Sequence, residues 1–239
     1  MKKVMLLAVS LVAFSTAFAQ KTEFSLQANT GVYRFSGSSA ESSTTVQYIT
    51  QQSGWNYTHN PHGNKLTLSL GVAGQVQRVT RGNVVLGLQA GAEFLQSKVN
   101  ITGAYSFWHM ANSSLTYVAA DGRSFFQHKF INVHPFLGRR LSVGPIAVDV
   151  TAGSDIGFCL QSTDNAKLKV ANGEELAFKA ERDKPSVDLR PRVGVTGYFR
   201  HIGVTASYAH GLTNYLGSYD GGNPEAYARV LRLGLLYRL

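Results

Sequence analysis

The alternation of apolar and polar residues constrains this chain more than any other feature of its sequence. Eight stretches place an apolar residue at every second position, and none of them has a convincing helical period. Their bounds are residues 24–32, 66–76, 84–94, 131–137, 146–158, 187–199, 202–208 and 231–239. These bounds enclose 7 to 13 residues, and with flanking positions we expect strands of about 10 to 14 residues, whereas an ordinary soluble strand has roughly 5 to 6. The pattern therefore predicts eight long β-strands.

The polar face of these stretches carries charge. Among its glycines, serines and glutamines lie seven ionisable residues: Glu93, Asp149, Asp155, Asp188, Arg190, Arg192 and Arg232. A soluble barrel keeps apolar residues inside and charged residues outside, whereas a membrane barrel of this kind reverses that order. The periodicity is compatible with either orientation, so other features have to decide between them.

The lengths of the connections favour the membrane orientation. Short links join the second stretch to the third, the fourth to the fifth and the sixth to the seventh, at residues 80–83, 141–145 and 200–201. The other links are long, at residues 36–63, 102–124, 161–186 and 213–225. Short turns on one rim and long loops on the other are typical of outer-membrane barrels with both termini in the periplasm. Aromatic residues near both ends of the stretches, and alternation up to Leu239, agree with this arrangement.

We therefore expect an all-β fold over residues 20–239, an eight-stranded antiparallel up-and-down transmembrane β-barrel with short periplasmic turns and long extracellular loops. A bilayer forces the sheet to close, because unpaired backbone groups are costly in hydrocarbon. Side chains fill the interior of so small a barrel, and buried charges need partners. We expect the four acids named above to pair with Arg190, Arg192 and Arg232.

Two prolines oppose this strand assignment. Pro135 and Pro191 lie inside predicted strands, where a proline removes a ladder hydrogen bond. If the strands are placed correctly, each proline must lie at a bulge or near a rim.

Residues 1–19 have the form of an export signal. Lys2 and Lys3 precede the apolar stretch 4–18, which is too short to span a bilayer comfortably, and Ala17-Phe18-Ala19 is a small-x-small cleavage site. We predict cleavage after Ala19 and an outer-membrane location. The two lysines leave +7 of the formal net charge of +9 on the mature chain. Its basic residues form no run, so we expect no nucleic-acid partner.

The sequence offers little that supports a cofactor or a metal. Cys159 is the one cysteine, which rules out an intrachain disulfide and a cysteine-built zinc site. There is no phosphate loop or dinucleotide fingerprint. His59 and His62 are interpreted as loop residues, and residues 220–223 as a turn that lacks the spaced acids of a calcium loop. We predict that no cofactor and no metal is bound.

The eight strands, the segment 131–137 with its internal Pro135, and the tail 230–239 resemble the small outer-membrane β-barrel family (OmpA/OmpX-like, porin superfamily) common in Gram-negative bacteria. The resemblance covers the mature chain and rests on pattern rather than on a motif. It implies outer-membrane lipid, lipopolysaccharide and the barrel-insertion machinery as partners, and a monomeric state. Members of this family end in an aromatic residue, whereas this chain ends in Leu239 with Tyr237 two residues earlier.

The main functional hypothesis is an integral outer-membrane protein without catalytic activity, in a structural or surface-interaction role. Trp55, Tyr57, Phe107 and Trp108 are candidate contact residues in the loops, and the charged segment 161–186 is expected to meet solvent or lipopolysaccharide.

Three alternatives remain. One is a narrow porin-like channel for ions or small solutes. Another is a soluble periplasmic or secreted barrel. The third is a rim-located lipid A-modifying enzyme that uses a histidine with a serine and an acid. For this enzyme, spacing alone singles out no set among His59, His62, His109, His128 and His210.

Overall fold

The computed structural model is an all-β fold and describes residues 19–49, 56–107, 115–217 and 222–239. Within these ranges the strands are β1 (Ala19–Ser36), β2 (Ser43–Ile49), β3 (Tyr57–Thr58), β4 (Thr67–Thr80), β5 (Val84–Phe107), β6 (Leu115–Val143), β7 (Ile146–Val170), β8 (Glu175–Glu181), β9 (Val187–Phe199), β10 (Ile202–His210) and β11 (Tyr227–Arg238). In the same ranges no helix is long and apolar enough to cross a membrane. The predicted signal peptide lies almost entirely outside the described residues.

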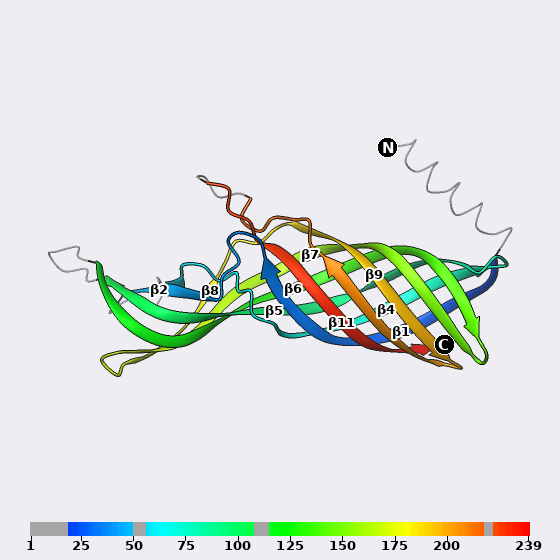
Figure 1. Cartoon of the computed structure of the whole chain (residues 1–239), viewed down its shortest axis with the longest axis horizontal. Coiled ribbons are helices and arrows are strands. Elements are labelled where there is room, and N and C mark those ends of the chain that lie inside the picture. The colour runs from blue at the N-terminus through cyan, green and yellow to red at the C-terminus, as the bar shows by residue number, and fades with distance from the viewer. Residues whose placement is uncertain (1–18, 50–55, 108–114, 218–221) are drawn as a thin grey trace.

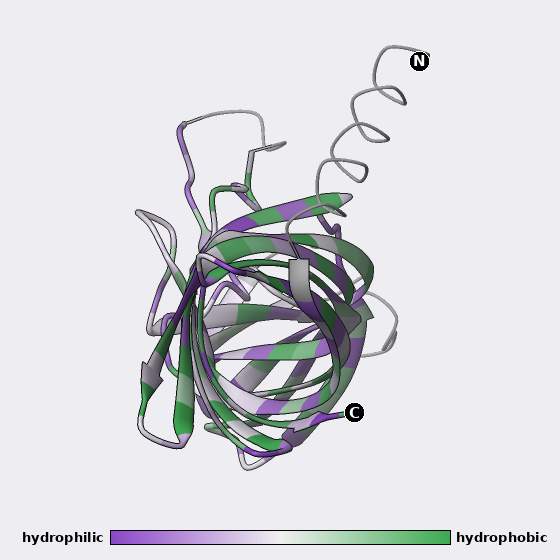
Figure 2. Ribbon diagram, turned by 90° about the vertical axis from the view of Figure 1, so that its right-hand side faces the viewer, coloured by the Kyte–Doolittle hydropathy of each residue, from purple (hydrophilic) through white to green (hydrophobic). Residues whose placement is uncertain are grey.

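Eight of these strands close into a ring. The order is β1, β4, β5, β6, β7, β9, β10 and β11, and β11 pairs back with β1 through the register Val32↔Leu231. Every neighbouring pair in the ring is antiparallel. Figure 2 looks into this ring and shows hydrophobic and hydrophilic residues alternating along the ribbons. The predicted all-β fold with eight principal strands is confirmed.

Three tight turns lie at one end of the ring, beside the start of β1 and the end of β11 (Figure 1). They join β4 to β5, β6 to β7 and β9 to β10. Asn83, Gly144 and Arg200 adopt φ values of 61°, 61° and 53° in these turns, the left-handed region that tight hairpins require. The short links predicted at 80–83, 141–145 and 200–201 are therefore turns, the second of them beginning only after Val143.

The apolar residues of the ring face outward and its charged residues face inward. Leu233 and Leu235 are 56% and 63% exposed, whereas the neighbouring Arg232 is 3% exposed. On β9, Val193 and Val195 are likewise exposed, and Asp188 and Arg190 are fully buried. This polarity is opposite to that of a soluble barrel and is the one expected for the membrane orientation.

The strands β5, β6 and β7 continue far beyond the ring, with 24, 29 and 25 residues. Their prolongations continue the same sheet beyond the ring. We call this part the extended sheet, and its strand order is β3, β2, β5, β6, β7 and β8. In it β2 runs parallel to β5 and β8 runs antiparallel to β7 (Figure 1). It buries an apolar cluster of its own, made by Val46, Tyr48, Ile101, Ala104, Ala166, Leu168 and Val170.

The extended sheet corrects the prediction that residues 36–63, 102–124 and 161–186 are loops. The β5–β6 ladder continues through Ala104↔Val118 to Phe107↔Leu115. In these prolongations the alternation buries apolar residues such as Val99 and Ile101, whereas in the ring it exposes them. Among the described residues, 36–63 and 161–186 are irregular only in part, and all of those in 102–124 belong to strands. The predicted strand length of about 10 to 14 residues is also wrong for β5, β6 and β7.

The two prolines lie where the ladder is interrupted. Pairing between β6 and β7 passes from Val133↔Ile156 to Phe136↔Gly153 and omits Pro135. Pairing between β9 and β10 ends at Arg192↔Ala209, one residue from Pro191. Each proline thus has a neighbour strand on one side to which it contributes no ladder bond, as its missing N–H requires. The strand assignments of both segments hold.

Adding a methyl group at Gly87 is expected to destabilise the fold, because the ring of Phe136 fills that space. Phe136 lies across the ladder from Gly87, and a Cβ at Gly87 would overlap the aromatic ring. Overpacking costs about 1–3 kcal/mol, so Gly87→Ala should lower the free energy of unfolding in urea by that amount. A Cβ at Gly197 would meet no atom within 4 Å, so Gly197→Ala should unfold at the wild-type midpoint. Equal midpoints for the two variants would contradict this packing.

Candidate functional site

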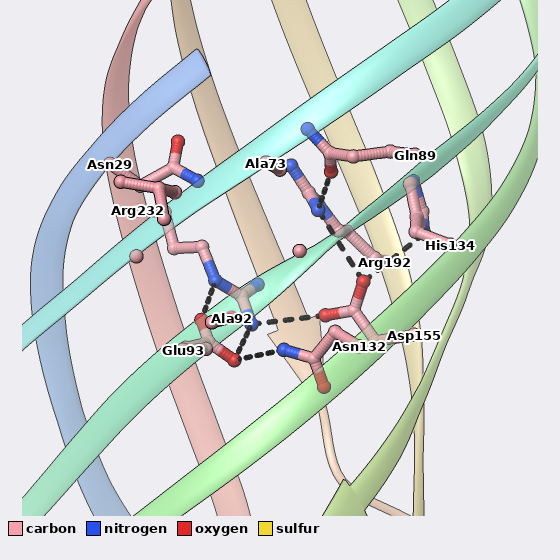
Figure 3. A pocket seen from close by; sticks show the side chains of 13 residues that line it. Asn29, Ala73, Gln89, Ala92, Glu93, Asn132, His134, Asp155, Arg192 and Arg232 are labelled. Atoms are coloured by element: carbon pink, nitrogen blue, oxygen red, sulfur yellow. Dashed lines mark hydrogen bonds and ion pairs between the residues drawn. The ribbon is translucent and has the colours of Figure 1, made fainter. Parts of the chain in front are cut away.

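A network of charges fills the middle of the ring (Figure 3). Glu93 of β5 accepts hydrogen bonds from Arg232 of β11, with Nε to Oε1 at 2.5 Å, and lies 3.2 Å from Nη2 of Arg190 on β9. Asp155 of β7 pairs with Nη2 of Arg232 at 3.0 Å and with Nη1 of Arg192 at 3.4 Å. Six of the seven charged residues selected from the sequence therefore meet here, since Asp188 also lies 3.6 Å from Nε of Arg190. We call these six residues the central network.

Two amide side chains and one imidazole complete the central network. Asn132 of β6 donates to Glu93 Oε2 at 2.6 Å and accepts from Arg190 Nη2 at 2.9 Å. Gln89 accepts from Arg192 at 2.9 Å, and Nδ1 of His134 lies 3.1 Å from Asp155. Buried charges need such partners because removal from water is costly. The network therefore joins charged side chains of β5, β7, β9 and β11 in the interior of the ring.

Asp149 does not join this network, and the prediction that it pairs with Arg190, Arg192 or Arg232 is wrong. Its partner is Arg140, whose Nε donates to Asp149 Oδ1 at 2.6 Å and whose Nη2 donates to Glu23 at 2.8 Å. Arg238 lies 3.2 Å from Glu23. Sequence reasoning missed Glu23 and Arg140 because both lie just beyond the predicted strand ends. Extending the same alternation by one residue before Phe24 and by three residues after Leu137 would have placed both on the inner face.

Little space remains between these side chains. The void beside Glu93, Asp155 and Arg232 measures about 30 Å³, and the void beside Gln77 and Asp149 measures about 20 Å³. Such volumes hold one or two water molecules. The interior around both sets of charges is a packed polar core.

Aromatic side chains cover the central network on the side of the extended sheet. We call this layer the aromatic lid: Tyr33, Phe35, Phe126, His128, Phe130 and Tyr215. Phe35 contacts Tyr33 and Tyr215 edge to face, with ring centroids 5.3 and 4.9 Å apart, a favourable geometry for aromatic pairs. Tyr215 donates its hydroxyl to Asp188 Oδ2 at 2.6 Å. The lid is therefore anchored to the network beneath it, and burial raises the pKa of Tyr215 well above its usual value, which keeps the hydroxyl protonated as a donor.

A cavity of about 340 Å³ lies on the other side of the lid, and we call it the mouth cavity. Phe126 and Tyr215 of the lid line it together with His62, and its remaining walls come from residues 39–41, 59–61, 181–183, 216 and 224. Asp164 of β7 holds the surrounding segments together. It is fully buried, accepts from Ser124 and from the backbone of Thr58 at 3.2 Å, and lies 3.7 Å from Nε of Arg182. Asp164 was missed because the sequence placed it in a loop.

The other residues singled out earlier are scattered. His59 bonds Thr45 and His210 bonds Tyr208, both at exposed positions, whereas His128 is buried in β6 rather than in a loop. Nδ1 of His128, which is part of the lid, lies 2.8 Å from Ser162 Oγ, and no acid of the described segments hydrogen-bonds this imidazole. Cys159 faces the ring interior and is buried with the lid. No group of three possible ligands for a metal occurs among the residues with described positions.

Of the four predicted contact residues, Trp55 and Trp108 lie outside the described residues, as do His109 and residues 220 and 221. Tyr57 lies in β3 and donates its hydroxyl to Gln47 at 2.8 Å. Phe107 ends β5 and pairs in register with Leu115.

Comparison with known proteins gives no family. No protein-family model matches the chain, and no curated protein matches it. Among solved structures, the chain is similar to Ail, the attachment invasion locus protein of Yersinia pestis, solved in complex with the heparin analogue sucrose octasulfate. The two share 13% sequence identity, the match covers 92% of this chain and 100% of that chain, and the TM-score is 0.36. The function of this chain has to be inferred from its own geometry.

Removing the Glu93 carboxylate is expected to destabilise the protein strongly. Glu93→Ala leaves Arg190 and Arg232 buried without their shared partner, and breaking a buried ion pair on one side costs about 3–5 kcal/mol. Denaturant unfolding of the detergent-folded protein should show a loss of that size. Glu175→Ala, at an exposed position of β8, is the control and should change stability by less than about 0.5 kcal/mol. A small loss for Glu93→Ala would show that the network does not stabilise the ring.

The neutral state of His62 gives the fold a pH dependence. Burial, followed by the positive charge of Arg182, lowers the pKa of His62 to about 3, compared with about 6.5 in an unfolded chain. The folded state then binds fewer protons between these values. The stability due to His62 is complete above pH 6.5 and falls as the pH drops towards 3, by up to about 1.4 kcal/mol per pH unit.

The measurement compares the free energy of unfolding at pH 7 and pH 5. The wild-type loss between these values should shrink in His62→Gln, which cannot take up the proton. It should persist in His201→Gln, a variant at the exposed turn on the opposite end of the ring. A loss of the same size in all three proteins would assign it to other groups.

Proposed function

We propose that the chain is an integral outer-membrane β-barrel protein without catalytic activity, which serves as a membrane-stabilising or surface-interaction module. The supporting observation is the polarity of the ring. All eight strands carry exposed large apolar side chains, among them Leu26, Leu70, Leu88, Leu137, Val150, Val195, Val204 and Leu235. Contiguous apolar surface on this scale is unfavourable in water, and a lipid bilayer is the solvent that removes the cost.

The closed hydrogen-bond ladder also supports a lipid bilayer as the surroundings of the ring. A bilayer core contains no water to bond free N–H and C=O groups, so a spanning sheet must have no edge. The pairing of β11 with β1 removes the edges of this ring. The tight turns and the two chain ends then face the periplasm, and the extended sheet faces the exterior. In this orientation lipopolysaccharide surrounds the base of the extended sheet, and the barrel-insertion machinery handles the strand that ends at Leu239.

The packed interior favours a closed module over the porin-like alternative. A conducting path would have to cross the aromatic lid, the central network and the ion pairs that Arg140 makes with Asp149 and Glu23. The voids of about 30 and 20 Å³ beside the charges leave no continuous passage for a hydrated ion. His128 and Ser162 are buried within the lid, away from any lipid substrate, which supports a non-enzymatic role over a lipid A-modifying one.

Cell fractionation and gel migration test the proposal. Mature protein made in a Gram-negative host should be recovered in the outer-membrane fraction and should migrate differently on SDS gels with and without boiling, because a closed barrel resists SDS until heated. Planar bilayers that contain it should show no conductance above background. Recovery in the soluble periplasmic fraction would overturn the proposal, and steady conductance would favour the pore.

A charge on the outer face of the ring should impair insertion. Leu233→Arg places a guanidinium among exposed leucines of β11, and at the middle of a bilayer this costs about 2–4 kcal/mol. The heat-modifiable fraction refolded into lipid vesicles should fall accordingly. Ala177→Arg adds the same charge at an exposed position of β8, outside the proposed bilayer, and should refold like the wild type. Equal refolding of both variants would contradict a lipid-facing β11.

A further inference from the structure

The mouth cavity has the composition of a ligand site. Its volume of about 340 Å³ falls within the roughly 300–1,000 Å³ of small-molecule pockets. Its floor is aromatic: the rings of His62 and Phe126 lie edge to face at 5.1 Å, and those of His62 and Tyr215 at 6.5 Å. Aromatic faces carry negative quadrupole charge and attract cations.

The tautomer of His62 can be assigned from its neighbours. Asn60 donates its Nδ2 to the backbone oxygen of Ser39 at 2.8 Å, which fixes Oδ1 towards His62. That oxygen accepts the backbone N–H of His62 at 3.1 Å and lies 3.2 Å from Nδ1. Nδ1 must therefore donate, and in the neutral ring Nε2 carries a lone pair. This buried imidazole offers the cavity an acceptor and no donor.

Two strong donors of the cavity lining, Tyr215 and Arg182, have partners inside the protein. Tyr215 donates its hydroxyl to Asp188. Arg182 donates to the backbone oxygen of Thr58, and its guanidinium lies beside the buried carboxylate of Asp164 and over the ring of Tyr57. The positive charge of Arg182 therefore has a counter-charge outside the cavity.

The acids around the cavity are not used in this way. The side chains of Glu41 and Asp183 make no hydrogen bond or ion pair with any residue whose position the structure describes, and Glu181 has one long contact of 3.5 Å with Gln161. The lining thus presents three carboxylates and an imidazole lone pair, all of them acceptors, above an aromatic floor. This negative rim belongs to a chain with a formal net charge of +9.

We propose that the mouth cavity binds a small organic cation, an ammonium group on an apolar body. The ammonium supplies the hydrogen-bond donors and the positive charge that the rim lacks, and the apolar body covers the rings of Phe126 and Tyr215. A neutral sugar fits less well because it carries no positive charge to pair with the three carboxylates of the lining. An anion is repelled by the rim. The proposal deepens the surface-interaction role, on which it rests for the outward opening of the cavity.

Calorimetric titration of the detergent-folded protein tests the site with three probes of one shape. 2-Phenylethylammonium should bind at least tenfold more tightly than neutral 2-phenylethanol, and anionic 3-phenylpropionate should not bind. The double variant Glu41→Gln/Asp183→Asn should weaken binding of the cation at least tenfold. The double variant Asp121→Asn/Glu174→Gln removes the same charge from exposed positions outside the cavity lining and should retain the wild-type affinity within twofold.

Several results would overturn the proposal: no binding of the cation by heat-modifiable protein, comparable affinity for the anion, or equal weakening by both double variants. Heat-modifiable migration on gels is checked first for every sample. A chain that never becomes heat-modifiable counts against the proposed membrane barrel, whereas a heat-modifiable chain that ignores the cation counts against this site alone.

Discussion

The rest of the structure depends on the burial of ionised side chains inside a closed ladder. Arg190, Arg232 and Glu93 lie in the interior of the ring with at most 8% of their surface exposed, a position that charges tolerate only with partners at hydrogen-bonding distance. The alternation of a β-strand then forces the residues between them to the outside. The same geometry that buries Arg232 therefore exposes Leu231 and Leu233. The inner charges pair with one another, and the proposed bilayer covers the outer apolar face.

The layers above the charges follow from the same arrangement. Asp188 belongs to the central network and also holds Tyr215, so the aromatic lid is fixed by the ion pairs below it. The lid is in turn the floor of the mouth cavity, whose walls are held by Asp164 and Arg182. The packed ring thus supports the mouth cavity at the end where the extended sheet begins. Binding residues on loops carried by a rigid scaffold are a common arrangement in proteins, and here prolonged strands replace much of the loop.

The sequence was informative where strict alternation applies and silent where it does not. Glu93, Asp155 and Arg190 could be placed inside the ring because the apolar residues of their stretches fall on the opposite face. Their individual partners could not be predicted, because pairing depends on register between strands far apart in the chain, and Asp149 accordingly meets Arg140 instead of the expected arginines. The prolonged parts of β5, β6 and β7 contain polar and charged residues that resemble loop composition, so their pairing was not expected. The contacts of Asp164 with Thr58, Ser124 and Arg182 join separate segments. A single sequence gives no signal for such contacts, nor for the tautomer of His62.

The central claim is that the outward residues of the ring contact lipid chains. The most direct measurement uses tryptophan fluorescence in vesicles whose lipid acyl chains carry bromine, which quenches only the indoles that touch it. With Trp55 and Trp108 replaced by phenylalanine, Leu233→Trp supplies one reporter on β11 and Ala177→Trp supplies one on β8. The account predicts strong quenching for Leu233→Trp and little for Ala177→Trp. An unquenched Leu233→Trp in heat-modifiable protein would contradict it.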